Sequence, residues 1–320
     1  MRKILTACFW FVVVAYPLNL LRADDPAEAL PLLTVSANRF GPTFELVTLD
    51  IAGQNANLEL PYRGEAHDPF WSPDGRKLVY RSGKFGPLQA CLFDVDRGEE
   101  INLTKSVVNE HQPVWSPDGQ KILFTSQRTG NLEIFVMNVD GSNPVNLTNN
   151  PAFDCDPTWS PDGKRIAFAS SRAPAARLYL MDADGSNVRD LLGRNLEGYI
   201  GPSWSPDGEQ ILYSGPDGTG ALQIFVVNAD GNAAEALTDG PGFNGYAVYS
   251  PDGRYIAYVH FDRPFAQAPE GGKLMLYDTE TLTHTPITPD GMRCGMSKVV
   301  WKPKQSEVGD DVKGAAKTRK

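Results

Sequence analysis

The segment Trp71-Ser72-Pro73-Asp74-Gly75 recurs along this 320-residue chain at a nearly constant spacing. Further copies begin at Trp115, Trp159, Trp204 and Tyr249, and successive prolines are separated by 44, 44, 45 and 45 residues. In each copy the proline presets φ for the start of a tight turn, and the glycine supplies the left-handed residue that completes it. Such a period predicts one supersecondary unit repeated along the chain.

Each unit has the same internal pattern of apolar runs and turn residues. An apolar run ends in the bulky aromatic, and the turn leads to a second run such as Lys121–Phe124. A polar loop follows, then a third run such as Ile134–Met137, an Asp140-Gly141 hairpin signal, and a short last run ending at Leu147-Thr148. Four antiparallel strands at this period are typical of a β-propeller blade.

The two ends of the repeat region complement each other. Residues 32–60 contain the second, third and fourth strands of a unit but lack the first. Residues 296–303, with Val299-Val300-Trp301, resemble that missing first strand. We therefore predict an all-β fold, a six-bladed β-propeller of four-stranded antiparallel blades, with the ring closed by the C-terminal strand joining the N-terminal blade, which leaves no sheet edge open.

The remaining segments suggest an exported protein. Arg2 and Lys3 precede an apolar run that is too short to span a bilayer, so residues 1–23 are predicted to be a signal peptide. An uncleaved membrane anchor is the alternative. Residues 24–31 are predicted to be a short linker, 32–303 the propeller and 304–320 a disordered polar tail, and no later segment is apolar enough to cross a membrane.

Composition excludes several classes of protein. Hydrophobic residues make up 41% of the chain and charged residues 22%, which is typical of a globular protein. The net charge of −9 argues against a nucleic-acid binder and against adhesion to anionic lipid. Beyond the signal segment stand Cys91, Cys155 and Cys294, and this odd count leaves at least one thiol unpaired. We predict a monomer with no disulfide scaffold.

The repeat resembles the TolB-type WD-like β-propeller repeat. Its pattern P-x-W-S-P-D-G, an apolar strand, S-x-R, an Asp-Gly-Ser turn and Leu-Thr covers about residues 32–303. The resemblance implies a periplasmic or secreted bacterial propeller that binds protein partners. Only residues 24–31 separate the predicted signal peptide from the first strand, so we expect the propeller without the α/β domain that precedes it in TolB.

Strand order predicts where a binding site lies. If the first strand of each unit is innermost, the residues four and three positions before the aromatic rim the mouth of the central channel on the upper face. These pairs are His67-Asp68, His111-Gln112, Cys155-Asp156, Ile200-Gly201, Gly245-Tyr246 and Ser297-Lys298. We predict a binding site at this channel mouth, made by His67, Asp68, His111, Gln112, Asp154, Asp156 and Tyr246.

Two interpretations of these side chains remain open. Imidazoles and carboxylates together are suited to zinc or another transition ion. Alternatively the same groups cap backbone at the strand starts or bind water. Neither a metal nor another cofactor is predicted. Arginines of the upper loops either contact a partner or pin their own loops; they are Arg39, Arg128, Arg172 and Arg263.

The function predicted from these observations is a protein-binding scaffold in the cell envelope. No nucleophile elbow, catalytic triad or phosphate loop is evident. The alternative is an enzyme, a lyase or hydrolase acting on a glycan or small ester at the channel mouth, with His67, Asp68, His111 and Asp156 as metal ligands or acid–base pair.

Overall fold

The computed structural model describes residues 31–38, 44–54, 57–58, 65–173, 175–193, 200–263, 271–295 and 297–303. These residues form strands, turns and bends, and none of them lies in a helix, which confirms the all-β prediction. Within these ranges there is accordingly no helix long and apolar enough to span a membrane. The predicted signal peptide, linker residues 24–30 and tail 304–320 lie outside the described residues.

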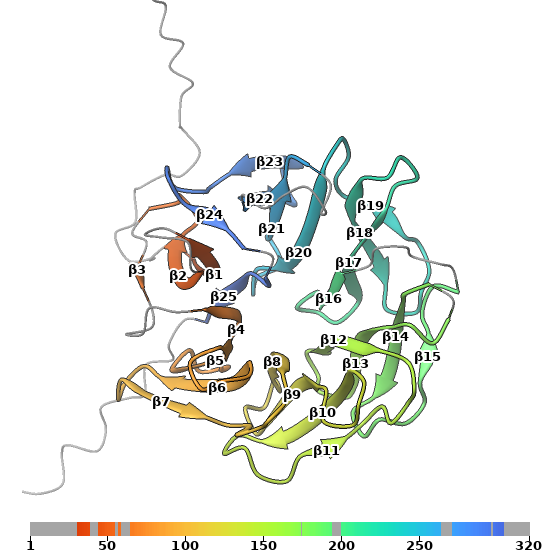
Figure 1. The fold of residues 1–320 in the computed structure, drawn as a ribbon. Helices are drawn as coiled ribbons and strands as arrows, with labels where there is room; N and C mark the ends of the chain where they lie inside the picture. Colours follow the sequence, from red (N-terminus) through yellow and green to blue (C-terminus); the bar gives the residue numbers. More distant parts are fainter. Residues whose placement is uncertain are drawn as a thin grey trace, which may run out of the picture. The chain divides into compact units, whose positions relative to one another are not determined.

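The strands follow the repeat along the chain (Figure 1). The N-terminal group is β1 (Leu32–Asn38), β2 (Glu45–Asp50) and β3 (Asn57–Leu58). The next is β4 (Ala66–Trp71), β5 (Lys77–Ser82), β6 (Gln89–Asp94) and β7 (Glu99–Asn102). It is followed by β8 (Glu110–Trp115), β9 (Lys121–Ser126), β10 (Glu133–Asn138) and β11 (Val145–Asn146). Then come β12 (Asp154–Trp159), β13 (Arg165–Ser170), β14 (Arg177–Asp182) and β15 (Arg189–Asp190).

The C-terminal half continues in the same way. Its first group is β16 (Ile200–Trp204), β17 (Gln210–Pro216), β18 (Leu222–Asn228) and β19 (Glu235–Ala236). The second is β20 (Phe243–Tyr249), β21 (Tyr255–Phe261), β22 (Lys273–Asp278) and β23 (Thr283–Pro286). Two short strands end the described chain, β24 (Arg293–Cys294) and β25 (Val300–Lys302).

The prediction of six separate four-stranded blades is wrong. Four sheets stand as single blades in the ring: three have four strands, and the one built on β1 has five because β24 and β25 both pair with β1. The remaining strands form one eight-stranded sheet. In it β16–β19 and β20–β23 are fused, because Leu222 of β18 forms a parallel bridge with Phe243 of β20. Period counting missed this bridge, since a backbone contact between repeats has no signature in the repeat itself.

The predicted pairing of the chain ends is confirmed. β25 is antiparallel to β1, with Trp301 opposite Leu33 and Val300 opposite Thr34. The C-terminal segment therefore supplies the inner strand that the N-terminal sheet lacks. It also contacts β4 on one side and, through the Trp301 indole, β20 on the other.

The first strand of each repeat is innermost in its sheet. Strands β4, β8, β12, β16 and β20 each contact the next in the series. The sheets thus follow one another around a ring (Figure 1). Each inner strand begins at one face of the ring, called the upper face below, and ends at the Ser-Pro-Asp-Gly turn on the lower face.

The Ser-Pro-Asp-Gly turns have a common hydrogen-bonded structure. In the turn after β4, the Ser72 hydroxyl donates to Asp74 Oδ1 at 2.6 Å and accepts from the Lys77 amide at 2.9 Å. Gly75 has φ of 67°, a value that favours glycine. The turn aspartates serve this local bonding, as expected of turn residues.

The core lies between neighbouring sheets. Trp71, Leu78, Tyr80 and Phe93 form one buried cluster, which also receives Val300 from the closing strand. Alternate residues of the same sheet, such as Val79 and Leu92, face the next sheet along the chain. Both faces of a blade are therefore apolar, which explains the nearly continuous hydrophobic runs in the second and third strands.

Candidate functional site

A β-bulge at one repeat position shapes the upper channel mouth. The pairing register shifts in each of the inner strands β4, β8, β12, β16 and β20. Each shift lies between the residue four positions before the aromatic and the residue directly before the aromatic. The bulged residues have positive φ: Asp68 (51°), Gln112 (50°), Asp156 (54°), Gly201 (38°) and Tyr246 (59°). Because a bulge redirects a side chain and leaves its backbone groups unpaired, this position needs polar partners.

Side chains of neighbouring repeats supply some of these partners. The Asp156 amide donates to Gln112 Oε1 at 3.1 Å, and the Gln112 amide group donates back to Asp156 Oδ1. The Gly201 amide in turn donates to Asp156 Oδ2 at 3.3 Å. Gln112 and Asp156 thus cap the bulged backbone of the following repeat. The geometry favours the capping interpretation for these two residues.

Asp68 is the centre of a second polar group. Its carboxylate lies 3.1 Å from Arg81 Nε, and its amide donates to Ser297 Oγ at 2.7 Å. Arg81 Nη1 also lies 3.2 Å from His111 Nδ1. Since a guanidinium has only donors, His111 accepts at Nδ1 and has its own proton on Nε2.

Both predicted histidines are disposed to be neutral. Burial and the Arg81 charge lower the pKa of His67, and the same two causes lower the pKa of His111. His67 Nδ1 lies 3.1 Å from Ser36 Oγ, and that hydroxyl donates to the Ala66 carbonyl at 3.0 Å. Because the Ser36 hydroxyl donates its proton to that carbonyl, its oxygen accepts the hydrogen bond from His67 Nδ1.

Lys298, two residues before β25, extends toward the inner strand of another sheet. Lys298 Nζ donates to the carbonyl of Pro157 in β12 at 3.4 Å. Burial lowers the pKa of Lys298, while Asp156 and Asp68 oppose that shift. Burial also raises the pKa of Asp156, against the effect of Lys298. The half-buried lysine and carboxylate stabilise each other's charge across the ring.

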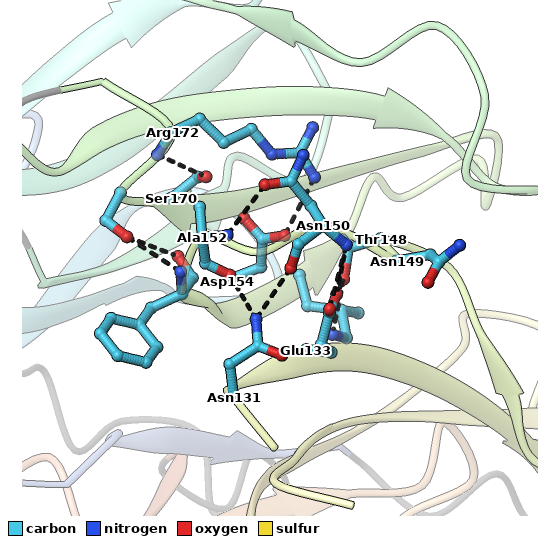
Figure 2. Close-up of polar contacts among 12 residues, drawn as sticks. Asn131, Glu133, Thr148, Asn149, Asn150, Ala152, Asp154, Ser170 and Arg172 are labelled. Atoms are coloured by element: carbon cyan, nitrogen blue, oxygen red, sulfur yellow. Dashed lines mark hydrogen bonds and ion pairs between the residues drawn. The ribbon is translucent and has the colours of Figure 1, made fainter. Parts of the chain in front are cut away.

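Asp154 does not join the channel-mouth groups. It is fully buried, and its Oδ2 accepts from Arg172 Nη2 at 2.9 Å (Figure 2). Its counterpart one repeat earlier, Glu110, pairs in the same way with Arg128 at 2.9 Å. Arg128 and Arg172, two of the four predicted upper-loop arginines, therefore pin their own loops. Arg39 lies outside the described residues, and the exposed Arg263 has no ion pair among those described.

Tyr246 faces a small cavity inside the channel. The cavity has a volume of about 30 Å³ and is also lined by Phe70, Gly201 and Lys298. Burial raises the pKa of Tyr246, so its hydroxyl keeps its proton. This volume suffices for a water molecule and is far below the 300 Å³ or more that is common for small-molecule sites.

The arrangement does not resemble a metal centre. Among the described residues, no group of three His, Cys, Asp or Glu side chains is placed to hold an ion. The Arg81 guanidinium forms an ion pair with Asp68 and a hydrogen bond with His111. A positive charge there opposes a cation. The described cysteines Cys91, Cys155 and Cys294 are all free.

Sequence reasoning missed Arg81, although the repeat contains a signal for it. Arg81 is the fifth residue of β5, and the equivalent residue is Thr125 in β9, Ala169 in β13 and Val259 in β21. It is a departure from the repeat directly opposite His67. Aligning the second strands and looking for the one charged residue at an otherwise small or apolar position would have found it.

Known proteins share this architecture. The family described as TolB beta propeller domain matches residues 33–217. TolB from Acinetobacter baumannii is 21% identical with a TM-score of 0.68, over 86% of this chain and 67% of that one. A putative TolB from Agrobacterium tumefaciens is 21% identical with a TM-score of 0.67, over 86% of this chain and 100% of that one.

A chain of a nidogen/laminin complex is similar in fold as well. It is 13% identical with a TM-score of 0.68, over 86% of this chain and 99% of that one. No curated protein matches the sequence. The family match spans more than half of the chain. The five repeats of the chain underlie the sheets and turns described above. The chain belongs to the TolB beta propeller domain family.

Proposed function

We propose that this chain is an exported protein-binding scaffold of the bacterial cell envelope, and that its partner docks on the upper face. The observation that favours this role is a set of exposed apolar side chains on the upper loops. Val107 is 91% exposed, Phe153 58% and Phe85 43%. Exposed apolar side chains on the loops of one face offer contacts to a protein partner.

The placement of these residues follows from strand direction. Phe85 lies between β5 and β6, Val107 between β7 and β8, and Phe153 directly before β12. All three connections are at the end of the ring where the inner strands begin. The channel mouth between them is filled by Asp68, Arg81 and their partners, so the partner contacts a surface and its rim in preference to a deep pocket.

Export and assembly state are part of the same proposal. Residues 1–23 act as a Sec-type signal peptide, and the mature chain is a periplasmic or secreted monomer without nucleic-acid partners. Membership of the TolB beta propeller domain family supports this location. The net charge of −9 supports a partner with basic residues around its apolar contact.

Capture from an envelope extract tests the proposal. The double variant Val107→Asp/Phe153→Asp places charge on the upper face, so it should lose the partner that the unaltered chain retains. The matched control is Val145→Asp/Leu282→Asp, at positions that are 54% and 69% exposed on the outer strand β11 and the turn before β23. Equal capture by both double variants, or no partner for the unaltered chain, contradicts the proposal.

No observation on the described residues favours the enzyme alternative. The cavity beside Tyr246, of about 30 Å³, leaves no room for a sugar ring. His111, Asp68 and Asp156, which the alternative needs as reacting groups, are engaged with Arg81, Ser297, Gln112 and Gly201. Partner binding is therefore the function that the geometry supports best.

A further inference from the structure

A larger cavity lies between β16–β19 and β20–β23, the two halves of the eight-stranded sheet. We call it the seam cavity; its volume is about 320 Å³. Val226, Leu237 and Ile256 form its apolar part, and Tyr249 and Tyr277 add two aromatic side chains. Asp207 and Gln210 lie at its polar side. This size and mixture of apolar, aromatic and a few polar groups is typical of small-ligand sites.

Asp207 is the one acidic or basic residue among those that line the seam cavity. Its Oδ1 accepts from Ser205 Oγ at 2.5 Å and from the Glu209 amide at 2.9 Å, and these bonds lower the pKa of Asp207. Burial raises the pKa of Tyr249 to about 12, with smaller contributions from Asp207 and Tyr277. At neutral pH the cavity therefore contains the Asp207 carboxylate beside the neutral phenol of Tyr249.

Tyr277 is held in place by an aromatic neighbour. Its ring centroid is 4.6 Å from that of His284, and His284 Nδ1 lies 3.0 Å from the Tyr258 hydroxyl. Tyr249 is fixed from the other side, since its hydroxyl donates to Gln210 Oε1 at 3.2 Å. Both aromatic side chains are preorganised, which lowers the entropic cost of binding.

The same place one repeat earlier contains a cation of the chain itself. Arg165, the first residue of β13, lies over the ring of Trp204 in the next repeat, with Cζ 4.7 Å from the centroid. Lys302 Nζ, from a different position one residue after Trp301, lies 4.2 Å from the centroid of Trp71. At the seam cavity, Gln210 occupies the position of Arg165 and Tyr249 that of Trp204. This repeat has the aromatic but not the cation.

We propose that the seam cavity binds an organic cation, an alkylammonium or guanidinium group such as that of a lysine or arginine side chain or of a free amine. The cation takes the place that Arg165 fills one repeat earlier, over the tyrosines and beside Asp207. The chain's net charge of −9 favours cations over anions. Arg254, which follows the lining residue Gly253, pairs with Asp278 and Glu280 instead.

This site differs from the one under Proposed function. It lies beside the lower-face turns Ser205–Gly208 and Ser250–Gly253, whereas the proposed partner surface is on the upper face. A failure of one proposal therefore leaves the other standing. The Val107→Asp/Phe153→Asp variant should bind the cation as the unaltered chain does.

The test is a titration of the full chain with Nα-acetyl-L-arginine amide, followed by amide chemical shifts in NMR. We expect saturable shifts for Gly253 and Thr279, which line the cavity. Nα-acetyl-L-glutamate amide and glucose are the anionic and neutral probes. Shifts of equal size with either of them, or no saturable shift with the arginine derivative, overturn the proposal.

Two variants localise the binding. Gln210→Arg supplies the cation from within the chain, so it should abolish arginine amide binding while the fold is kept. Asp207→Asn should weaken binding about fivefold and remove its dependence on salt. The matched control is Asp162→Asn, because Asp162 has the same turn bonds to Ser160 and Lys164 in another repeat. Unchanged binding in Gln210→Arg refutes the assignment.

A deca-arginine peptide separates the two sources of the cation. Binding at least tenfold tighter than the acetylated amide, and lost in Gln210→Arg, indicates a side chain of a basic polypeptide. Equal affinity per arginine indicates a small amine as the ligand. Either result supports the cation site, and binding of the peptide that survives Gln210→Arg contradicts it.

Discussion

The indole nitrogen of Trp301 donates to the carbonyl of Val248 at 3.4 Å, although 53 residues separate them in sequence. Trp301 belongs to β25, which pairs with β1, whereas Val248 belongs to β20. One side chain thus connects the last sheet of the chain to the first. The C-terminal strand joins the two ends of the ring through both its backbone and this side chain.

Truncation of Trp301 should open that connection. The residue is 7% exposed, and Trp301→Ala should reduce the free energy of unfolding by about 3–5 kcal/mol, because a large buried aromatic is lost. Urea denaturation at neutral pH measures the loss. The control is deletion of residues 304–320, which contain no apolar period and should leave the midpoint unchanged. A Trp301→Ala midpoint equal to that of the unaltered chain shows that β25 does not hold the ring closed.

Removing Arg172 should leave a buried charge unpaired. Asp154 is fully buried, and Arg172 is its ion-pair partner at 2.9 Å (Figure 2). We expect Arg172→Met to destabilise the fold by roughly 3–5 kcal/mol, and Arg172→Met/Asp154→Leu to recover most of that loss, since the double variant has no unpaired charge. Thermal melting of the single and double variants checks this. A double variant no more stable than Arg172→Met refutes the pairing argument.

Loss of the Gln112 side chain should expose the cost of the bulge. Gln112 Oε1 is the acceptor for the Asp156 amide, which has no strand partner at the bulge. Gln112→Ala should cost about 1–3 kcal/mol, whereas Gln120→Ala, in an exposed turn, should cost less than about 0.5 kcal/mol. Denaturant melts compare the two. Equal effects mean that capping contributes nothing at this position.

Stability should fall as pH drops below neutrality. Burial and Arg81 lower the pKa of His67 and His111 from the ordinary value of 6.5. Below pH 6.5 the unfolded chain therefore binds protons that the folded chain does not, so the free energy of unfolding decreases with falling pH and is fully retained above that value.

Denaturation at about pH 7.5 and about pH 5.5 measures this dependence. In His67→Gln/His111→Gln the decrease should be smaller, because two of the groups responsible are gone. His284, whose pKa burial also lowers, accounts for part of the remaining slope. An identical slope in the double variant removes the two channel-mouth histidines from the explanation.

Much of this molecule is determined by its sequence. Five Ser-Pro-Asp-Gly segments at a constant period require repeated tight turns, and the apolar runs between them require strands that are buried on both faces. The missing first strand near residue 32 and the spare strand at residues 300–302 establish that the ends pair. These features are local or periodic, so pattern alone reveals them.

Tertiary structure decided the rest. Leu222 and Phe243 fuse two repeats into one sheet through backbone bonds that no side-chain pattern encodes. The bulges turn Asp68, Gln112 and Asp156 toward partners in other repeats, and Asp154, only two residues from Asp156, pairs with Arg172 instead. Sequence placed these polar groups near one end of the ring. Which of them meet depends on bulge geometry and on contacts between segments about 45 residues or more apart, and those exist only once the ring has closed.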